Sequence, residues 1–223
     1  MNRRDRSATI RNVDFAGVFE THVTVRGDAR AVAEWAAARG VKFVHIVLER
    51  GRVASQPMLT LPFGGTLDEA RADAARTVRD LEADGFAVAR VKIEAAPWNA
   101  GVPVTDGEAL GPAYYFEHHV KLLLDAGADT GAGTGAETEA LARTVRPHAA
   151  HVSRNARRVR SDGRRERFVT QRCRRVGART AGARLDALTA ALRADGHEIA
   201  GVEREFVVFD GDESLDDGWI EEP

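Results

Sequence analysis

The sequence predicts an α+β fold made of two similar halves, each with the element order β-α-β-β-α-β. Two observations carry this prediction. The string FETHVTV at 19–25 recurs as FEHHVKL at 116–122, and EADGFAVARVKIE at 82–94 resembles RADGHEIAGVERE at 193–205. Around these strings, strand-like alternation and helix-like periodicity follow one another in the same order in both halves. Two matches in the same order indicate an internal duplication.

The first half contains two helices with clear ends. In the segment 28–39, Asp28 is a candidate N-cap and Gly40 stops the helix. The second helix begins at a capping box, Thr66–Glu69, and ends at Gly85. The strands of this half are expected at 17–26, 41–50, 54–61 and 86–95.

The second half repeats this order, with an Asp162-Gly163 turn in its central hairpin. Its strands are expected at 114–124, 150–160, 166–174 and 197–209, and its helices at about 136–146 and 180–195. This is the order of the ferredoxin-like fold. Halves of this size bury little surface alone. We therefore expect tandem duplicated ferredoxin-like halves whose antiparallel sheets pack together.

The positions of the prolines and of the charged segments divide the chain further. We expect a basic N-terminal tail (1–16), a first half (17–95), a linker with three prolines (96–113), a second half (114–210) and an acidic C-terminal segment (211–223). The last segment either docks back as an apolar plug through Trp219 and Ile220 or remains a solvated tail. The region 154–175 carries ten arginines, which either neutralise acidic segments or line an anion site.

Several classes of protein are disfavoured by composition. No run of about 18 apolar residues exists, so no membrane span is expected. The formal net charge of -2 gives no general attraction to nucleic acid or membrane. The single cysteine, Cys173, cannot form an internal disulfide, and the N-terminus lacks the apolar core of a signal peptide. A cytoplasmic location is the expectation.

Successive side chains of a strand point to opposite faces of the sheet, so alternation predicts which of them point away from the face that the helices cover. In strand 41–50 we expect Val44, Ile46 and Leu48 to face the helices. Polar side chains are expected on the open faces: Glu20, His22, His45, Lys92, Glu94, Glu117, His119, Lys121, His151, Asn155, Glu203 and Glu205. Four of the seven histidines fall there as matched pairs, His22 with His119 and His45 with His151. A merely solvated polar face is the alternative interpretation.

The spacing Glu-x-His, at Glu20–His22 and Glu117–His119, places a carboxylate about 6–7 Å along the strand from an imidazole. Such pairs suit proton transfer near neutral pH. The candidate catalytic residues are His22, His119, Glu20, Glu117 and His45. The candidate substrate-binding residues are Lys92, Glu94, Lys121, His151, Asn155, Arg157 and Arg172. Histidine and glutamate also suit a divalent metal, but no HExxH or paired CxxC motif assigns one, so the cofactor is unknown.

Three functions remain open. The first is an enzyme that uses His/Glu acid–base chemistry on a small anionic substrate in a polar cleft between the halves. The second is a non-catalytic interaction or regulatory protein with a protein partner or a second copy of the chain. The third, an RNA-binding module, is disfavoured because Phe43 alone is clearly placed for base stacking. The discriminating feature is whether the histidine pairs converge in a closed cleft.

Two resemblances add to this interpretation. The strings SQPMLT (55–60), RVKIEAAPWN (90–99), YFEHHVKLLL (115–124), HVSRNARRVR (151–160) and RFVTQRC (167–173) resemble a family of bacterial proteins of uncharacterised activity, over roughly 17–220. That resemblance implies no activity, cofactor or catalytic residue. The string Glu203-Arg204-Glu205 is similar to the E-x-E-x-K strand of the triphosphate-tunnel (CYTH-type) enzymes, although Val207 stands where the lysine belongs.

Overall fold

The structure, a computed structural model, describes residues 13–124, 133–156 and 164–220. The elements of the first half are β1 (Ala16–Arg26), α1 (Ala29–Ala38), β2 (Lys42–Leu48), β3 (Ser55–Thr66), α2 (Leu67–Ala83) and β4 (Ala87–Ala95). Those of the second half are β5 (Tyr115–Leu124), α3 (Gly133–Val145), β6 (Ala150–Asn155), β7 (Arg165–Arg174), α4 (Ala178–Ala194) and β8 (Glu198–Asp210). The predicted order β-α-β-β-α-β is confirmed in both halves.

The helix ends follow the predicted caps. The Asp28 side chain accepts a hydrogen bond from the backbone N–H of Arg30 at the start of α1. At the start of α2, Thr66 and Glu69 form the complete capping box, each side chain accepting a hydrogen bond from the other residue's backbone N–H. Both contacts satisfy N–H groups that have no partner inside the helix.

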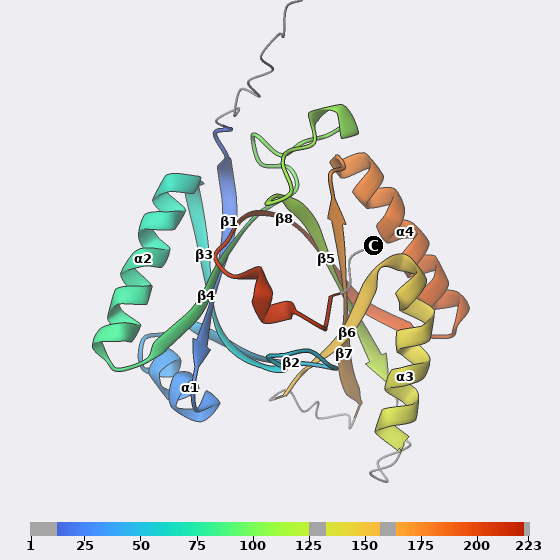
Figure 1. The fold of residues 1–223 in the computed structure, drawn as a ribbon, viewed down its shortest axis with the longest axis horizontal. Helices are drawn as coiled ribbons and strands as arrows, with labels where there is room; N and C mark the ends of the chain where they lie inside the picture. The colour runs from blue at the N-terminus through green and yellow to red at the C-terminus, as the bar shows by residue number, and fades with distance from the viewer. Residues whose placement is uncertain (1–12, 125–132, 157–163, 221–223) are drawn as a thin grey trace, which may run out of the picture.

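The eight strands form one closed antiparallel barrel in the order β1-β3-β2-β6-β7-β5-β8-β4 (Figure 1). The halves join edge to edge, through β2 with β6 and β4 with β8. The sheets therefore share hydrogen bonds along their edges, rather than packing face to face as expected. Helices α1 and α2 cover the outside on one side and α3 and α4 on the other, so the polar faces of both halves turn into the barrel. The internal duplication stays a prediction.

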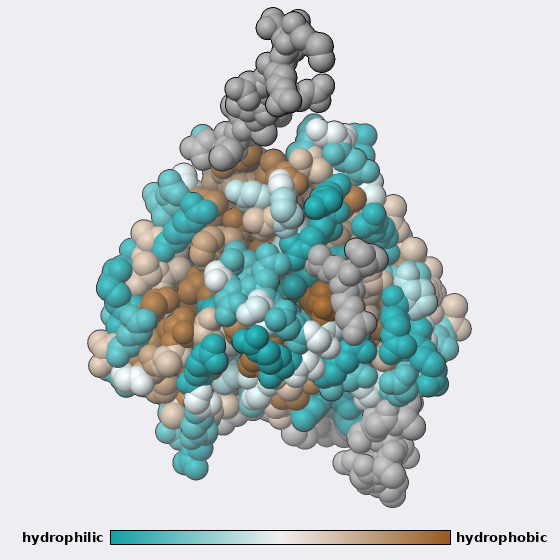
Figure 2. Space-filling view, viewed as in Figure 1, coloured by the Kyte–Doolittle hydropathy of each residue, from teal (hydrophilic) through white to brown (hydrophobic). Residues whose placement is uncertain are grey.

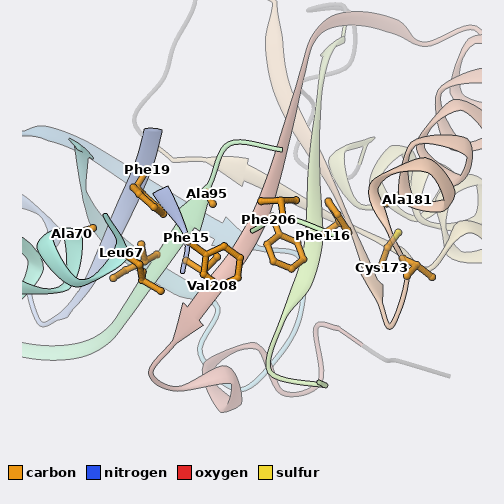
Figure 3. Packing of buried hydrophobic residues seen from close by; sticks show 13 residues of the cluster. Phe15, Phe19, Leu67, Ala70, Ala95, Phe116, Cys173, Ala181, Phe206 and Val208 are labelled. Carbon is orange, nitrogen blue, oxygen red and sulfur yellow. The ribbon is translucent and has the colours of Figure 1, made fainter. Parts of the chain in front are cut away.

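Three apolar clusters hold the helices against the outside of the barrel. One lies under α1 and α2 and includes Trp35, Leu59 and Leu81. A second lies under α3 and α4 and includes Leu141 and Leu188. The third contains residues of both halves, among them Phe19, Leu67, Phe116, Cys173 and Phe206, packed around the junction of β4 and β8 (Figure 3). The halves consequently share a hydrophobic core.

The connecting segments also pack on the barrel. In the linker, Asn99 exchanges two hydrogen bonds with the backbone of Val18 at 3.0 and 2.7 Å. A side chain at Gly17 would collide with Asn99, which explains the glycine. After β8, residues 211–220 cross one end of the barrel, and their surface there is largely hydrophilic (Figures 1 and 2). Trp219 is buried there, so this part of the chain docks back onto the barrel.

Among the described residues, no helix has the length and apolar character needed to span a membrane.

Candidate functional site

The barrel encloses a cavity of about 190 Å³. Its wall is chemically divided. The strands β1, β4, β5 and β8 contribute mainly charged side chains and histidines, whereas the opposite wall is mainly apolar or uncharged. The less polar wall is lined by Val44, Ile46, Leu48, Gln56, Met58, Ser153, Asn155 and Phe168, and it also carries two charged residues, Lys42 and Arg172.

His119 on β5 lies at the centre of the charged wall. Its Nε2 is 3.2 Å from Glu117 on the same strand and 3.4 Å from Glu205 on β8. Its Nδ1 hydrogen-bonds the hydroxyl of Thr170 at 3.0 Å on the neighbouring strand β7. Both ring nitrogens therefore have partners, and the ring orientation is fixed.

His22 on β1 has the matching environment in the first half. Its Nε2 is 2.9 Å from Glu94 on β4 and 3.7 Å from Glu20, and its Nδ1 contacts the Thr60 hydroxyl at 3.3 Å. Each half thus supplies one histidine, one glutamate from its first strand, one glutamate from its last strand and one threonine from its third strand.

Lys92 connects the two histidine sites. Its Nζ lies 2.6 Å from Glu94 and 2.5 Å from Glu117, so one ammonium contacts a carboxylate from each half. The side chains of Glu94 and Glu117 are only 1% and 2% exposed. Buried carboxylates require such partners, because an unpaired buried charge costs several kcal/mol.

The electrostatics differ between the carboxylates. Burial alone would raise the pKa of Glu117 and Glu94, but Lys92 and its cationic neighbours outweigh burial and hold both pKa values well below the usual range. For Glu205, burial and the negative charge of Glu94 dominate, and they raise its pKa to about 7. Compared with Glu94 and Glu117, Glu205 therefore keeps its proton to higher pH and exchanges it near neutral pH.

The pKa of each histidine lies above its ordinary value. Burial lowers the pKa of His119, but hydrogen bonds and charges from Glu117 and Glu205 outweigh it and raise the value to about 10. Burial likewise opposes protonation of His22, yet Glu94 raises its pKa above the ordinary value. At pH 7 His119 is an imidazolium ion, hence a potential proton donor.

A second charged cluster lies where the C-terminal segment crosses the barrel. Asp216 contacts Arg90 at 2.9 Å and Arg172 at 2.6 Å. Arg90 also pairs with Asp210, and Arg172 with Glu117 at 2.5 Å. Arg172 therefore links this cluster to the histidine site.

Most predicted site residues lie at this cavity. It is lined by or in direct contact with Glu20, His22, Lys92, Glu94, Glu117, His119, Lys121, Asn155 and Arg172, together with Glu203 and Glu205. The Glu-x-His spacing brings the two groups closer than the backbone repeat alone implies, because the side chains lean toward each other. Pairing with Asp216 and Glu213 also shows that the acidic C-terminal segment neutralises arginines of β7.

The prediction for His45 is wrong, because this residue does not face the cavity. Its ring contacts the Ser55 hydroxyl at 2.8 Å on the outer side of the barrel. Val44, Ile46 and Leu48 of β2 were expected to face the helices, but they line the cavity. Phe43 instead packs against the cluster beneath α1. Apolar residues occur on both faces of this strand, so alternation could not identify the inner one.

Two other predicted residues lie elsewhere. His151 is buried, with its ring centre 6.0 Å from that of Trp219, and it belongs to a neighbouring pocket rather than to the main cavity. Arg157 lies outside the described residues.

Sequence reasoning missed the residues that support the histidines and arginines. Thr60 and Thr170 occupy matching positions of the repeat, and this match was the available signal. Arg90, Asp210 and Asp216 carry no local pattern, since their partners lie far away along the chain.

Among the residues that the structure describes, two sets of side chains have ligand atoms close enough for a metal ion, within 4.8 Å of one another: His22, Glu94 and Glu205, and Glu94, Glu117 and His119. Lys92 already contacts Glu94 and Glu117. A cation at the second set would therefore have to displace that ammonium. The first set has the donor types that zinc, iron and manganese accept.

Comparisons with known proteins leave the function open. No family model and no curated protein matches the chain. Solved structures with some likeness include the small subunit of acetolactate synthase from Thermotoga maritima (14% identity, 85% of this chain and 94% of that chain, TM-score 0.27). Others are a putative chlorite dismutase (13%, 89% and 96%, 0.29) and a heme-binding protein from Thermus thermophilus (14%, 87% and 92%, 0.30). At these TM-scores no property carries over, and nothing supports the resemblance to triphosphate-tunnel enzymes.

Proposed function

We propose that the protein is an enzyme that performs acid–base chemistry on a small anionic substrate inside the barrel. The observation that carries this proposal is the pair of His–Glu sites that meet in one cavity, with both nitrogens of each ring held. Such groups transfer protons efficiently when their orientation is fixed, and the pKa of Glu205, about 7, lies near a neutral working pH.

The two histidines take unequal roles in this proposal. The side chains of His119 and Glu205 are 23% and 18% exposed, so a bound molecule reaches them more easily than Glu94 or Glu117. His119 donates a proton to the substrate, and Glu205 accepts one. Glu117 and Thr170 position His119, while His22 and Lys92 support the charge balance.

A cation that would attract an anionic substrate into the cavity is Lys121. This lysine lines the cavity one alternation step along β5 from His119, with its Nζ 5.5 Å from the centre of the Phe168 ring. A cation within a partly closed cavity attracts carboxylate or phosphate groups.

The proposal is tested by thermal-shift screening with carboxylates, phosphorylated metabolites and nucleotides, and separately with divalent metals. A ligand at 100 times its Kd stabilises the fold by about 2.7 kcal/mol. We expect His119→Gln to remove the shift and His22→Gln to reduce it. His45→Gln serves as the matched control, because His45 lies outside the cavity, and should retain the shift.

Retention of every ligand shift in His119→Gln would contradict the proposal. A screen without small-molecule ligands, combined with capture of a defined protein partner, would favour the non-catalytic alternative. Circular dichroism at the temperature of the assay checks that each variant is folded, since each imidazole belongs to a buried charge network.

A further inference from the structure

We propose that Arg90, Arg172 and Gln56 form a binding subsite for the carboxylate group of a small ligand, and that Asp216 occupies this subsite until such a ligand displaces it. The inference deepens the proposed function, because it names the substrate class of the same cavity. It can be tested by binding alone.

The three donors converge on one carboxylate. Nη1 of Arg90 and Nη2 of Arg172 both donate to Oδ2 of Asp216, at 2.9 and 2.6 Å. Nε2 of Gln56 donates to Oδ1 at 3.1 Å. The donors come from β4, β7 and β3, and so from both halves of the barrel. Two guanidinium groups and an amide are well suited to the planar, two-oxygen geometry of a carboxylate.

The barrel itself orients both arginines. Nε of Arg90 donates to Asp210, the last residue of β8, at 2.7 Å. Nε of Arg172 donates to Glu117 on β5 at 2.5 Å. These contacts do not involve Asp216. The remaining N–H groups would therefore still point to the same place after Asp216 had left, and a preorganised site loses little entropy when a ligand binds.

Asp216, by contrast, lies outside the strands of the barrel, although its side chain is buried. It ends a four-residue 3-10 turn, Glu213–Asp216, that follows β8. Gly211 and Gly218 bracket this turn, and Gly218 has a φ of 77°, a left-handed conformation that glycine adopts readily. Beyond it, Trp219 is anchored separately by a hydrogen bond from its indole to the Val152 carbonyl. Displacement of Asp216 therefore requires this turn to move between its two attached ends and to break the contact of Glu213 with Arg174.

The surroundings define the rest of the ligand. Arg172 also contacts Glu117, which contacts His119, so a carboxylate in this subsite lies beside the acid–base groups. Ile46, Leu48 and Met58 line the same cavity and offer an apolar surface. The volume of about 190 Å³ is slightly above the roughly 150 Å³ that accommodates benzene. The expected ligand is a small monocarboxylic acid with a short apolar body.

The experiment measures binding of acetate, butyrate and benzoate to the full chain by calorimetry at pH 7 and constant ionic strength. Displacing the turn exposes the buried Leu215, so the wild type should bind weakly. In Asp216→Ala the competing carboxylate is gone, and we expect the Kd for butyrate or benzoate to fall at least tenfold. Adding Arg172→Gln to this variant should abolish the gain. Asp217→Ala, at a neighbouring side chain that is 60% exposed, should behave as the wild type.

Equal affinity of Asp216→Ala and the wild type, or no binding to either, would overturn the inference. Tighter binding of inorganic phosphate than of any carboxylate would overturn the assigned class. If Asp216→Ala does not fold, hydrogen exchange of the wild type decides: saturating butyrate should speed exchange at the amides of 212–217, and unchanged exchange counts against the inference. If no carboxylate binds but another ligand binds in a way that requires His119, this inference is wrong and the proposed function still stands.

Discussion

At the scale of single residues, the site depends on a difference between carboxylates of the same type. Glu117 contacts Lys92, Arg172 and His119, so it stays ionised. Glu205 pairs with His119 at 3.4 Å, but burial and the charge of Glu94 outweigh this contact, so Glu205 keeps a proton to higher pH. Position within one charge network, rather than residue type, separates a positioning group from a proton-exchanging group.

Glu205→Gln should change how stability depends on pH. The folded-state pKa of about 7 lies above the ordinary 4.5, so ionised Glu205 weakens the folded state, and this penalty develops as the pH rises from about 4.5 to 7. We expect the variant to exceed the wild type by on the order of 2 kcal/mol at pH 8, with little of this gain at pH 4.5. Urea unfolding at both pH values measures the difference.

The matched control is Glu203→Gln, two residues earlier on β8, where the side chain is exposed. It should change the free energy of unfolding by no more than about 0.5 kcal/mol. A Glu205→Gln variant that is less stable than the wild type at pH 8 would show that its contact with His119 outweighs the repulsion from Glu94.

At the scale of elements, the local signals for helix α2 are fully realised. Thr66 accepts a hydrogen bond from the Glu69 backbone N–H, and the Glu69 carboxylate accepts one from the Thr66 backbone N–H. The apolar stripe on α2 then faces the barrel, with Leu67, Ala70 and Leu81 buried. Capping and periodicity together decide where this helix lies.

Thr66→Ala should destabilise the protein by about 1 kcal/mol, because the N-terminal N–H groups of α2 lose a side-chain acceptor. Urea denaturation measures the change. Thr77→Ala, the same substitution in the interior of α2, is the control. It should cost less, because alanine has the higher helix propensity there. Equal losses at both positions would mean that the cap contributes no more than an ordinary threonine of the helix.

At the scale of the whole molecule, barrel closure makes the two halves interdependent. The pairs β2–β6 and β4–β8 supply hydrogen bonds between the halves, and one apolar cluster contains side chains from both. Separating the halves would expose the strand edges of β2 and β4 together with that apolar surface. Exposed edges of this kind promote association.

The full chain should therefore unfold in a single cooperative transition, whereas a fragment of residues 13–113 should self-associate. Light scattering coupled to size-exclusion chromatography measures the mass of the fragment, and calorimetry tests the cooperativity of the full chain. A stable monomeric fragment, or two separate unfolding transitions, would show that each half folds by itself.

The sequence determined the elements and most of the inward-facing polar residues. Caps such as Thr66–Glu69 act within a few residues, and alternation on β1 and β5 contrasts apolar with charged side chains, so both could be predicted locally. The Glu-x-His repeats located His22 and His119 for the same reason. Strand β2 was different, because it is apolar on both faces and alternation alone gave its inner face wrongly.

Only the tertiary structure decided that the two sheets close into one barrel. That closure depends on pairing between β2 and β6 and between β4 and β8, which lie far apart in sequence. Backbone groups make these pairs, so the side-chain pattern of a strand does not specify its partner. Closure also brought Asp216, on the C-terminal turn, to Arg90 and Arg172 from opposite halves. Local sequence patterns determine which side chains each strand directs into the barrel, whereas long-range backbone pairing determines which of these side chains come into contact.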